Sequence, residues 1–416
     1  MLIYIPFIWF LGLMLYFRYH ERRWNIGVAA ASIFVVISFF AIIIDINNLY
    51  GEYGINTKAY TLPTLLLFCL QGTITLLPLH YISNLQIEQV PYQKEKLLRI
   101  LVWCLIISAG VSYILVCSEL IKIIAEGDFA KVRIEHYEDI EDPFIEQESR
   151  NYIKLLISLL TTPCFTTLDI ILAMYIFAFS TSKRFGAYLL LSSTAGIGSS
   201  ILIAGRSAII YWIFSIYLIY LLFYPYIDTT IKRRLNLVIQ ILIVSIGVVF
   251  LLITFSRFNS RNPFDSLCGY AGQHINNFCA IMQEGGNSPH QSERIFPLTN
   301  KLLHHKNFNL KQHYDTIESH TNVIVHVFDT FGAEVYCDFG SIGYILCLSL
   351  IILTYIFIKS HWNSIAFNRI FPLSIIIVFF VNGLFAWPFV GHYATSSVLL
   401  MGIIYILFRY NFKFKK

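Results

Sequence analysis

The sequence predicts an all-α polytopic membrane protein with about 11 transmembrane helices and one large external loop. The chain is 56% hydrophobic and only 13% charged, and its mean hydropathy is +0.64. Soluble domains typically have about 25% charged residues. Its apolar runs are long enough to cross a bilayer, which takes roughly 20 residues in a helix. Because these runs are continuous, without the alternation of a membrane barrel, they favour helices.

Eleven apolar runs lie along the chain, and each is expected to form one membrane helix. The first has no preceding basic region and no small-residue cleavage site, so we expect it to be retained and not removed as a signal peptide. The runs cover residues 2–17, 24–44, 61–82, 100–121, 152–180, 187–204, 208–224, 235–255, 340–358, 370–390 and 395–408.

Basic residues in the connections predict the orientation. Lys and Arg follow every odd-numbered run, whereas the connections after the second and fourth runs are rich in acidic residues. Since short cytoplasmic connections are enriched in Lys and Arg, the N-terminus is predicted to be periplasmic and the C-terminus cytoplasmic. The basic residues are Arg18, Arg22, Arg23, Lys94, Lys96, Arg99, Lys183, Arg184, Lys232, Arg233, Arg234, Lys359, Arg369, Arg409, Lys413, Lys415 and Lys416.

One long polar segment, 257–337, interrupts the apolar pattern and is predicted to be the external loop. It divides the chain into eight helices over 1–256, the loop, and three helices with a basic tail over 338–416. A loop of this length is uncommon unless it is functional or disordered. It holds seven of the twelve histidines, so it is the part of the chain in which we look for acid–base chemistry.

The loop also contains Cys268 and Cys279. In an oxidising periplasm these could form a disulfide, and two free thiols are equally compatible with the sequence. Neither the cysteines nor the histidines have the spacing of a zinc site. This spacing therefore predicts no metal. We also expect no cofactor and no nucleic-acid partner.

Two features lie within the predicted helices. Asp169 is an ionisable group in the fifth run, which makes it a functional candidate, although a structural hydrogen bond to the serine-rich sixth run explains it equally well. The sixth run contains Gly196 and Gly198 among several serines. Small residues of this kind allow helices to approach closely, so packing is the preferred interpretation.

Arg206 lies in a tight turn between the sixth and seventh runs, at the predicted external face. A guanidinium there can bind a phosphate through two parallel hydrogen bonds, or it can anchor the helix end among lipid headgroups. Arg257 and Arg261 lie four residues apart beyond the eighth run. If the helix continues, this spacing places both on one face.

Two short stretches resemble bacterial O-antigen (Wzy-type) and related repeat-unit polymerases. One is the Gly205-Arg206-Ser207 turn, which is similar to the arginine-bearing helix start of that family. The other closes the long loop and is similar to its T-N…Y-x-D-F-G-x-x-G signature. It comprises His320-Thr321-Asn322 and then Tyr336-Cys337-Asp338-Phe339-Gly340-Ser341-Ile342-Gly343.

The resemblance implies a GT-C-like glycosyltransferase of the bacterial inner membrane that works without a metal. Such an enzyme polymerises undecaprenyl-diphosphate-linked oligosaccharide repeat units at the periplasmic face, and a chain-length regulator protein is a further partner it implies. Its diphosphate leaving group needs fixed cations, and the acceptor hydroxyl needs a base. We assign diphosphate binding to Arg206, Arg257 and Arg261, and His320 is the first choice of base. His313 and His326 are substitutes, Glu334 and Asp338 are alternative catalytic groups, and Tyr336 is assigned to substrate binding.

Two other classes remain open. A different lipid-carrier-dependent transferase, such as a polysaccharide ligase, would use similar arginines and a loop histidine. A glycolipid transporter or flippase would explain the helices and Asp169, but the sequence has no internal repeat or paired interrupted helices.

Overall fold

A computed structural model of the chain describes residues 2–51, 55–91, 94–126, 158–180, 182–202, 207–257, 262–285, 294–296, 310–325, 329–389 and 392–410. These residues are overwhelmingly helical, which confirms the all-α class. Among them, six helices are long and apolar enough to cross a membrane, and three shorter helices are also apolar. The chain therefore has the helices of a multi-pass membrane protein. The six cover Ile26–Asn47, Leu62–Ile82, Glu95–Cys117, Ser207–Tyr226, Thr229–Ile253 and Phe331–His361.

Each of the eleven predicted runs overlaps a helix, but two differ from the prediction in an informative way. The sixth run is divided into α9 (Lys183–Ser192) and α10 (Ala195–Leu202). The ninth run begins at Gly340, inside α16 (Phe331–His361). Hydropathy located the long apolar part of α16 and missed its first turns, which carry the charged Glu334 and Asp338.

The described chain forms two compact units. The first comprises Met1–Leu85, Phe258–Asn363 and Phe379–His392, and the second comprises Gln86–Arg257, Ser364–Val378 and Tyr393–Lys416. The helices that begin and end in the first unit are α1 (Tyr4–Glu21), α2 (Ile26–Asn47), α3 (Leu62–Ile82), α13 (Pro263–Glu284), α15 (Leu310–Thr321) and α16. The described part of the predicted loop thus belongs to the same unit as the first three helices.

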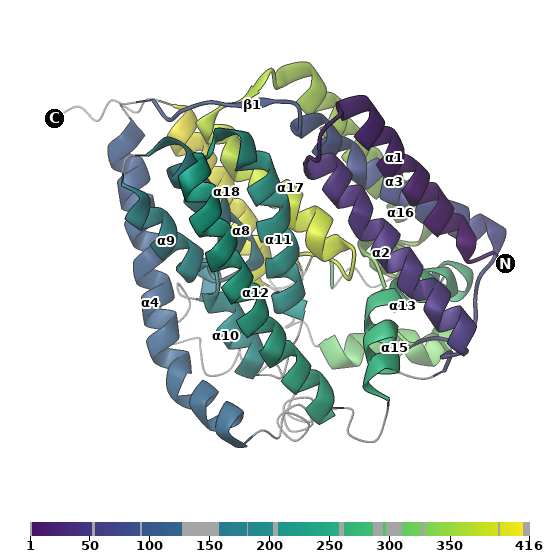
Figure 1. The fold of residues 1–416 in the computed structure, drawn as a ribbon. Helices are drawn as coiled ribbons and strands as arrows, with labels where there is room; N and C mark the ends of the chain where they lie inside the picture. Colours follow the sequence, from purple (N-terminus) through teal and green to yellow (C-terminus); the bar gives the residue numbers. More distant parts are fainter. Residues whose placement is uncertain are drawn as a thin grey trace. The chain divides into compact units, whose positions relative to one another are not determined.

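In the first unit, α1, α2 and α3 pack side by side, as the purple and blue helices of Figure 1 show. Helix α13 approaches α2 closely, because Gly272 faces the backbone of α2. A Cβ atom at Gly272 would lie 2.5 Å from the backbone nitrogen of Ala41 and 2.5 Å from the carbonyl carbon of Phe40. Only glycine fits this helix crossing.

A buried amide cluster fixes the connection between α2 and α3 against α13. Asn277 Oδ1 accepts hydrogen bonds from the backbone N–H and the Nδ2 of Asn56, each 3.0 Å long. Asn276 Nδ2 donates to the backbone carbonyl of Asn56 at 2.8 Å. Asn56 Oδ1 in turn accepts from the backbone N–H of Ile324 at 2.7 Å. Because each amide is satisfied within the cluster, these polar residues can be buried without a large desolvation cost.

The helix α16 is divided by a kink at Gly340. This residue has φ 65° and ψ −163°, a combination that essentially only glycine adopts. Thr330 caps the first segment, since its side chain accepts from the backbone N–H of Ala333 at 3.3 Å. The glycine of the Asp338-Phe339-Gly340 motif therefore has a backbone role. It separates a short buried segment, which carries Glu334 and Asp338, from the long apolar one.

The second unit contains most of the remaining apolar helices. In it, α8 (Pro163–Phe179) packs against α9 and α11 (Ser207–Phe223). Helix α4 (Glu95–Glu126) packs against α9 and α10. A two-residue parallel ladder pairs Gln86 with Ser364 and Ile87 with Ile365. The elements of the second unit are β1 (Gln86–Ile87), α4, α8, α9, α10, α11, η3 (Tyr224–Tyr226), α12 (Thr229–Arg257), β2 (Ser364–Ile365), η5 (Phe367–Arg369), α17 (Ile370–Gly383, whose last residues belong to the first unit) and α18 (His392–Arg409).

The two loop cysteines, Cys268 and Cys279, lie on the same helix, α13, and both are free thiols. A rise of about 1.5 Å per residue separates them by roughly 16 Å, whereas disulfide-bonded Cα atoms lie within about 7 Å. The disulfide that the sequence left open is therefore excluded in this fold.

The α2–α13 contact can be tested by adding a single methyl group. Gly272→Ala is expected to lower the free energy of unfolding by about 1–3 kcal/mol, because the two backbones must move apart. Gly247→Ala on α12 is the matched control, since no described atom lies within 4 Å of its Cβ position. That change should raise stability by about 0.5–1 kcal/mol through helix propensity. Thermal unfolding in detergent measures both, and equal behaviour of the two variants would contradict the close crossing.

Candidate functional site

Two carboxylate side chains project from the first segment of α16 into the interior of the first unit. Glu334 and Asp338 are four residues apart, so they share one face of the helix. They are 3% and 1% exposed. Buried carboxyl groups are rare unless they are paired, hydrogen-bonded or functional, and this pair forms the centre of a polar cluster.

Arg294 supplies the positive charge of the cluster. Its Nη2 is ion-paired with Oε1 of Glu334, and both side chains are almost completely buried. The second oxygen of Glu334 accepts a hydrogen bond from the backbone N–H of Trp387 at 2.8 Å. The guanidinium carbon of Arg294 also lies 4.8 Å from the centre of the Tyr314 ring, in a cation–π contact. Arg294 therefore connects α15 and α16.

Asp338 is held from two sides. The backbone N–H of Ile295 donates to its Oδ2 at 3.2 Å, and Nε2 of His313 lies 3.5 Å from its Oδ1. His313 comes from α15 and is 3% exposed. A histidine beside a buried carboxylate can exchange a proton with it, which is the arrangement that acid–base chemistry requires.

A third carboxyl group, Asp329, lies just before α16 and is 1% exposed. Burial raises its pKa well above the ordinary value, and the neighbouring negative charge of Glu334 raises it further, while Arg294 opposes the shift. Asp329 also shares a side-chain hydrogen bond with Glu334. Since three buried negative charges around one arginine would be costly, Asp329 holds a proton and donates that bond.

The ionisation of Arg294 and His313 follows from the same surroundings. Burial acts against the charge of Arg294, but the adjacent Glu334 carboxylate more than offsets it, so the pKa of Arg294 is raised. Burial lowers the pKa of His313 to about 4, and the positive charge of Arg294 acts in the same direction. Near neutral pH the cluster thus contains a guanidinium cation and a neutral imidazole.

Several polar atoms of the cluster have capacity left for a ligand. Within the described residues, Nε of Arg294 and the Oδ1 atoms of Asp329 and Asp338 make no hydrogen bond. Native proteins satisfy most buried polar atoms, so such a concentration in one place requires an explanation. Among all the residues that the structure describes, no three His, Cys, Asp or Glu side chains are arranged to hold a metal ion. The fixed positive charge here is Arg294.

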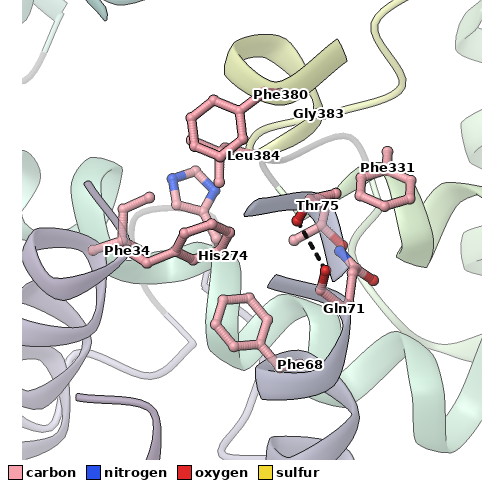
Figure 2. Close-up of a pocket in the computed structure, with 11 residues that line it drawn as sticks. Phe34, Phe68, Gln71, Thr75, His274, Phe331, Phe380, Gly383 and Leu384 are labelled. Carbon is pink, nitrogen blue, oxygen red and sulfur yellow. Dashed lines mark hydrogen bonds between the residues drawn. The ribbon is translucent and has the colours of Figure 1, made fainter. Parts of the chain in front are cut away.

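A small cavity lies beside the cluster and is lined by His274 of α13 and Thr330. Figure 2 shows the rings of Phe34, Phe68 and Phe380 around the imidazole of His274. Burial lowers the pKa of His274 to about 3, against a smaller opposing effect of a hydrogen bond with the backbone of Asp329. The cavity volume of about 10 Å³ is room for about one water molecule. It is too small for a sugar.

Of the nine residues that the sequence singled out, the structure brings His313, Glu334 and Asp338 into the cluster. His320 is exposed at the end of α15, where its Nδ1 lies 2.7 Å from the carbonyl oxygen of Thr316. Tyr336 is half-buried and packs against Gly285 at the end of α13. The other four are only partly described or not described: Arg257 ends α12 with no described side chain, and Arg206, Arg261 and His326 lie outside the described residues.

Two residues of the cluster, Arg294 and Asp329, were missed from the sequence. The loop contains three arginines, and only the two next to the membrane run attracted attention. Arg294 is followed directly by Ile295 and Phe296, and a cation beside apolar residues within a polar segment is a signal of burial. Asp329 follows Val327-Phe328 and so carries a similar signal, but its contact with Glu334 depends on the folding of α16.

No protein-family model, no characterised protein and no solved structure matches the chain. Function is therefore argued from the geometry of the Arg294–Glu334–Asp338 cluster together with the sequence motifs.

The buried ion pair can be tested by a double-mutant cycle. Glu334→Gln leaves the positive charge of Arg294 buried without its Glu334 partner. Arg294→Met likewise leaves the negative charge of Glu334 buried without its arginine. Each single change should therefore lower the free energy of unfolding by about 3–5 kcal/mol. The double variant, Arg294→Met with Glu334→Gln, removes both charges and should be more stable than either single variant. Unfolding in detergent measures the cycle, and simply additive losses would show that the two residues are not paired.

The His313 environment gives a pH dependence with a defined sign. Because its pKa falls from 6.5 to about 4 on folding, the unfolded chain takes up the proton first as the pH falls. The stability associated with neutral His313 is therefore present above pH 6.5 and is lost as the pH falls towards 4. Between about pH 7.5 and 4.5 the melting temperature of the wild type should fall by about 2 °C more than that of His313→Gln. His274 is common to both proteins, so parallel profiles would contradict the assignment.

Proposed function

We propose that this protein is a lipid-carrier-dependent glycosyltransferase that polymerises oligosaccharide repeat units linked to undecaprenyl diphosphate. The observation that carries the proposal is the position of Asp338. It belongs to the motif that resembles repeat-unit polymerases, and its carboxylate lies in the buried cluster, 3.5 Å from His313. Catalytic acids and bases are commonly found in such low-dielectric clusters of titratable groups.

In the proposed reaction, the acceptor hydroxyl transfers its proton to Asp338 while its oxygen attacks the anomeric carbon of the lipid-linked glycan. A new glycosidic bond forms, and the bond from that carbon to the diphosphate breaks. The electron pair leaves with the diphosphate, which needs fixed cations as counter-charges; the sequence motifs assign this role to Arg206, Arg257 and Arg261. Asp338 then releases the proton to water as the product leaves, which resets the site, while the neutral His313 stays beside it. No step requires an oxidant or a nucleotide.

Arg294 and Glu334 keep the site closed in this scheme until substrate binds. The ion pair fixes the Arg294–Phe296 segment over α16, and the backbone N–H of Ile295 in that segment orients the Asp338 carboxylate. Asp338 is only 1% exposed, so the proposal requires this segment to move aside when the substrate binds, as covering segments do in many enzymes. The Phe296 ring, which packs on Phe339 at 5.7 Å and is 51% exposed, is the contact that such a movement would break.

Reconstitution with a lipid-diphosphate-linked oligosaccharide tests the function. The wild type should produce a ladder of products, whereas Asp338→Asn should lose about 10²–10⁴-fold in rate and Arg206→Ala should not elongate the chain. Asp315→Asn is the matched control, because Asp315 is an exposed acid on α15, and it should retain the full ladder. Wild-type ladders from Asp338→Asn would exclude Asp338 as the base.

The same assay separates the other classes. A single transfer to a different acceptor would identify a polysaccharide ligase. Movement of the glycolipid across the membrane without a new bond would identify a transporter, and in that case the buried cluster would be a proton site and not a catalytic one.

A further inference from the structure

The second unit contains a pocket of about 600 Å³ between α4, α8 and α9. This volume is in the range of small-molecule binding sites. The pocket lies wholly within that unit, and none of its lining residues belongs to the candidate site described above. It begins at the first turn of α4 and extends towards the C-terminal end of α8.

The interior of the pocket is aromatic and apolar. Tyr175 and Val102 are 3% and 4% exposed, and the half-buried rings of Phe179 and Phe185 complete the wall. Tyr175 packs against Phe179 with ring centres 5.0 Å apart. Its hydroxyl oxygen accepts a hydrogen bond from the backbone N–H of Val90, so the ring is fixed in the wall of the pocket.

The mouth of the pocket carries one charge of each sign. Arg99 Nη2 lies 3.8 Å from Oε2 of Glu95, and the two side chains are 77% and 42% exposed. Exposed pairs of this kind are weak, so the two groups can separate to bind a ligand. Nearby Lys94 is committed elsewhere, because its Nζ donates to the carbonyl oxygens of Leu407 and Tyr410 at 3.0 and 2.6 Å.

The pocket also opens beside a surface suited to acyl chains. Trp103 lines it and is 49% exposed, and tryptophan is enriched where membranes meet water. Further along the same apolar helix, Ile107 and Ile114 are 59% and 77% exposed. In a membrane-spanning helix such residues face lipid. A ligand with a charged head and an apolar tail matches this gradient from mouth to interior.

We propose that this pocket binds one phospholipid whose headgroup is zwitterionic and carries a primary ammonium, namely a phosphatidylethanolamine. The phosphate accepts hydrogen bonds from the Arg99 guanidinium, and the ammonium donates to the Glu95 carboxylate. The upper part of one acyl chain lies against Tyr175, Phe179 and Phe185, and the rest follows the exposed face of α4.

The two charges distinguish this headgroup from the other common ones. A phosphatidylcholine has no N–H with which to hydrogen-bond to Glu95. A phosphatidylglycerol has a phosphate for Arg99 but no cation for Glu95, which would then face a second negative charge. Of these three headgroups, the ethanolamine one satisfies both side chains together.

Native mass spectrometry of the full-length chain in detergent tests the proposal, with the three lipids carrying identical acyl chains. The ethanolamine lipid should bind with a dissociation constant at least about fivefold lower than either of the others. Equal binding of the three lipids would overturn the proposal, as would binding of a lipid-free disaccharide that excludes the phospholipid.

Variants at the mouth locate the binding to this pocket. Arg99→Gln and Glu95→Gln should each weaken binding of the ethanolamine lipid about fivefold or more. Lys96→Gln is the matched control, since Lys96 is an exposed cation on the same turn of α4 but does not line the pocket, and it should bind as the wild type does. All three changes are at surface positions, and circular dichroism verifies folding. Unchanged binding by both pocket variants, or an equal loss in Lys96→Gln, would contradict the site.

Discussion

The first unit depends on neutralising one buried positive charge. Arg294 cannot be removed from water unless a carboxylate accompanies it, and Glu334 provides that carboxylate from the first segment of α16. The same guanidinium lies over Tyr314 of α15, and the next residue in the chain orients Asp338. Through the ion pair and the cation–π contact, Arg294 thus joins its own segment to α15 and to α16.

The kink at Gly340 makes this arrangement compatible with a membrane helix. The buried polar turns of α16 end at Phe339, and the long apolar segment follows the glycine in a new direction. Two demands that conflict in a straight helix, a polar interior face and a lipid-facing surface, are therefore met by successive segments. In the proposed enzyme this would place acid–base groups at the end of a membrane helix, close to where a lipid-linked substrate lies.

The sequence was sufficient for the fold class but only for part of the site. Hydropathy located the apolar runs because lipid imposes a composition on every spanning helix. It could not locate the start of α16, because Glu334 and Asp338 lower the hydropathy of the first turns. It also did not locate the break between α9 and α10. Glu334 and Asp338 could be selected because they lie in or beside a motif. The sequence favoured His320 over His313 because His320 lies beside that motif. In the structure His313 is buried and His320 is exposed. This difference depends on how α15 packs, which the sequence pattern does not show. The partnership of Arg294 with Glu334, 40 residues apart, is a tertiary contact that no local pattern encodes.

The central claim is that the Arg294–Glu334–Asp338 cluster is where a sugar hydroxyl is activated. An experimental structure of the chain with a bound lipid-diphosphate oligosaccharide tests it most directly. The account requires a sugar hydroxyl within about 3 Å of an Asp338 carboxylate oxygen, with the Arg294–Phe296 segment displaced. A glycan bound elsewhere, with Asp338 still enclosed between Ile295 and His313, would contradict it.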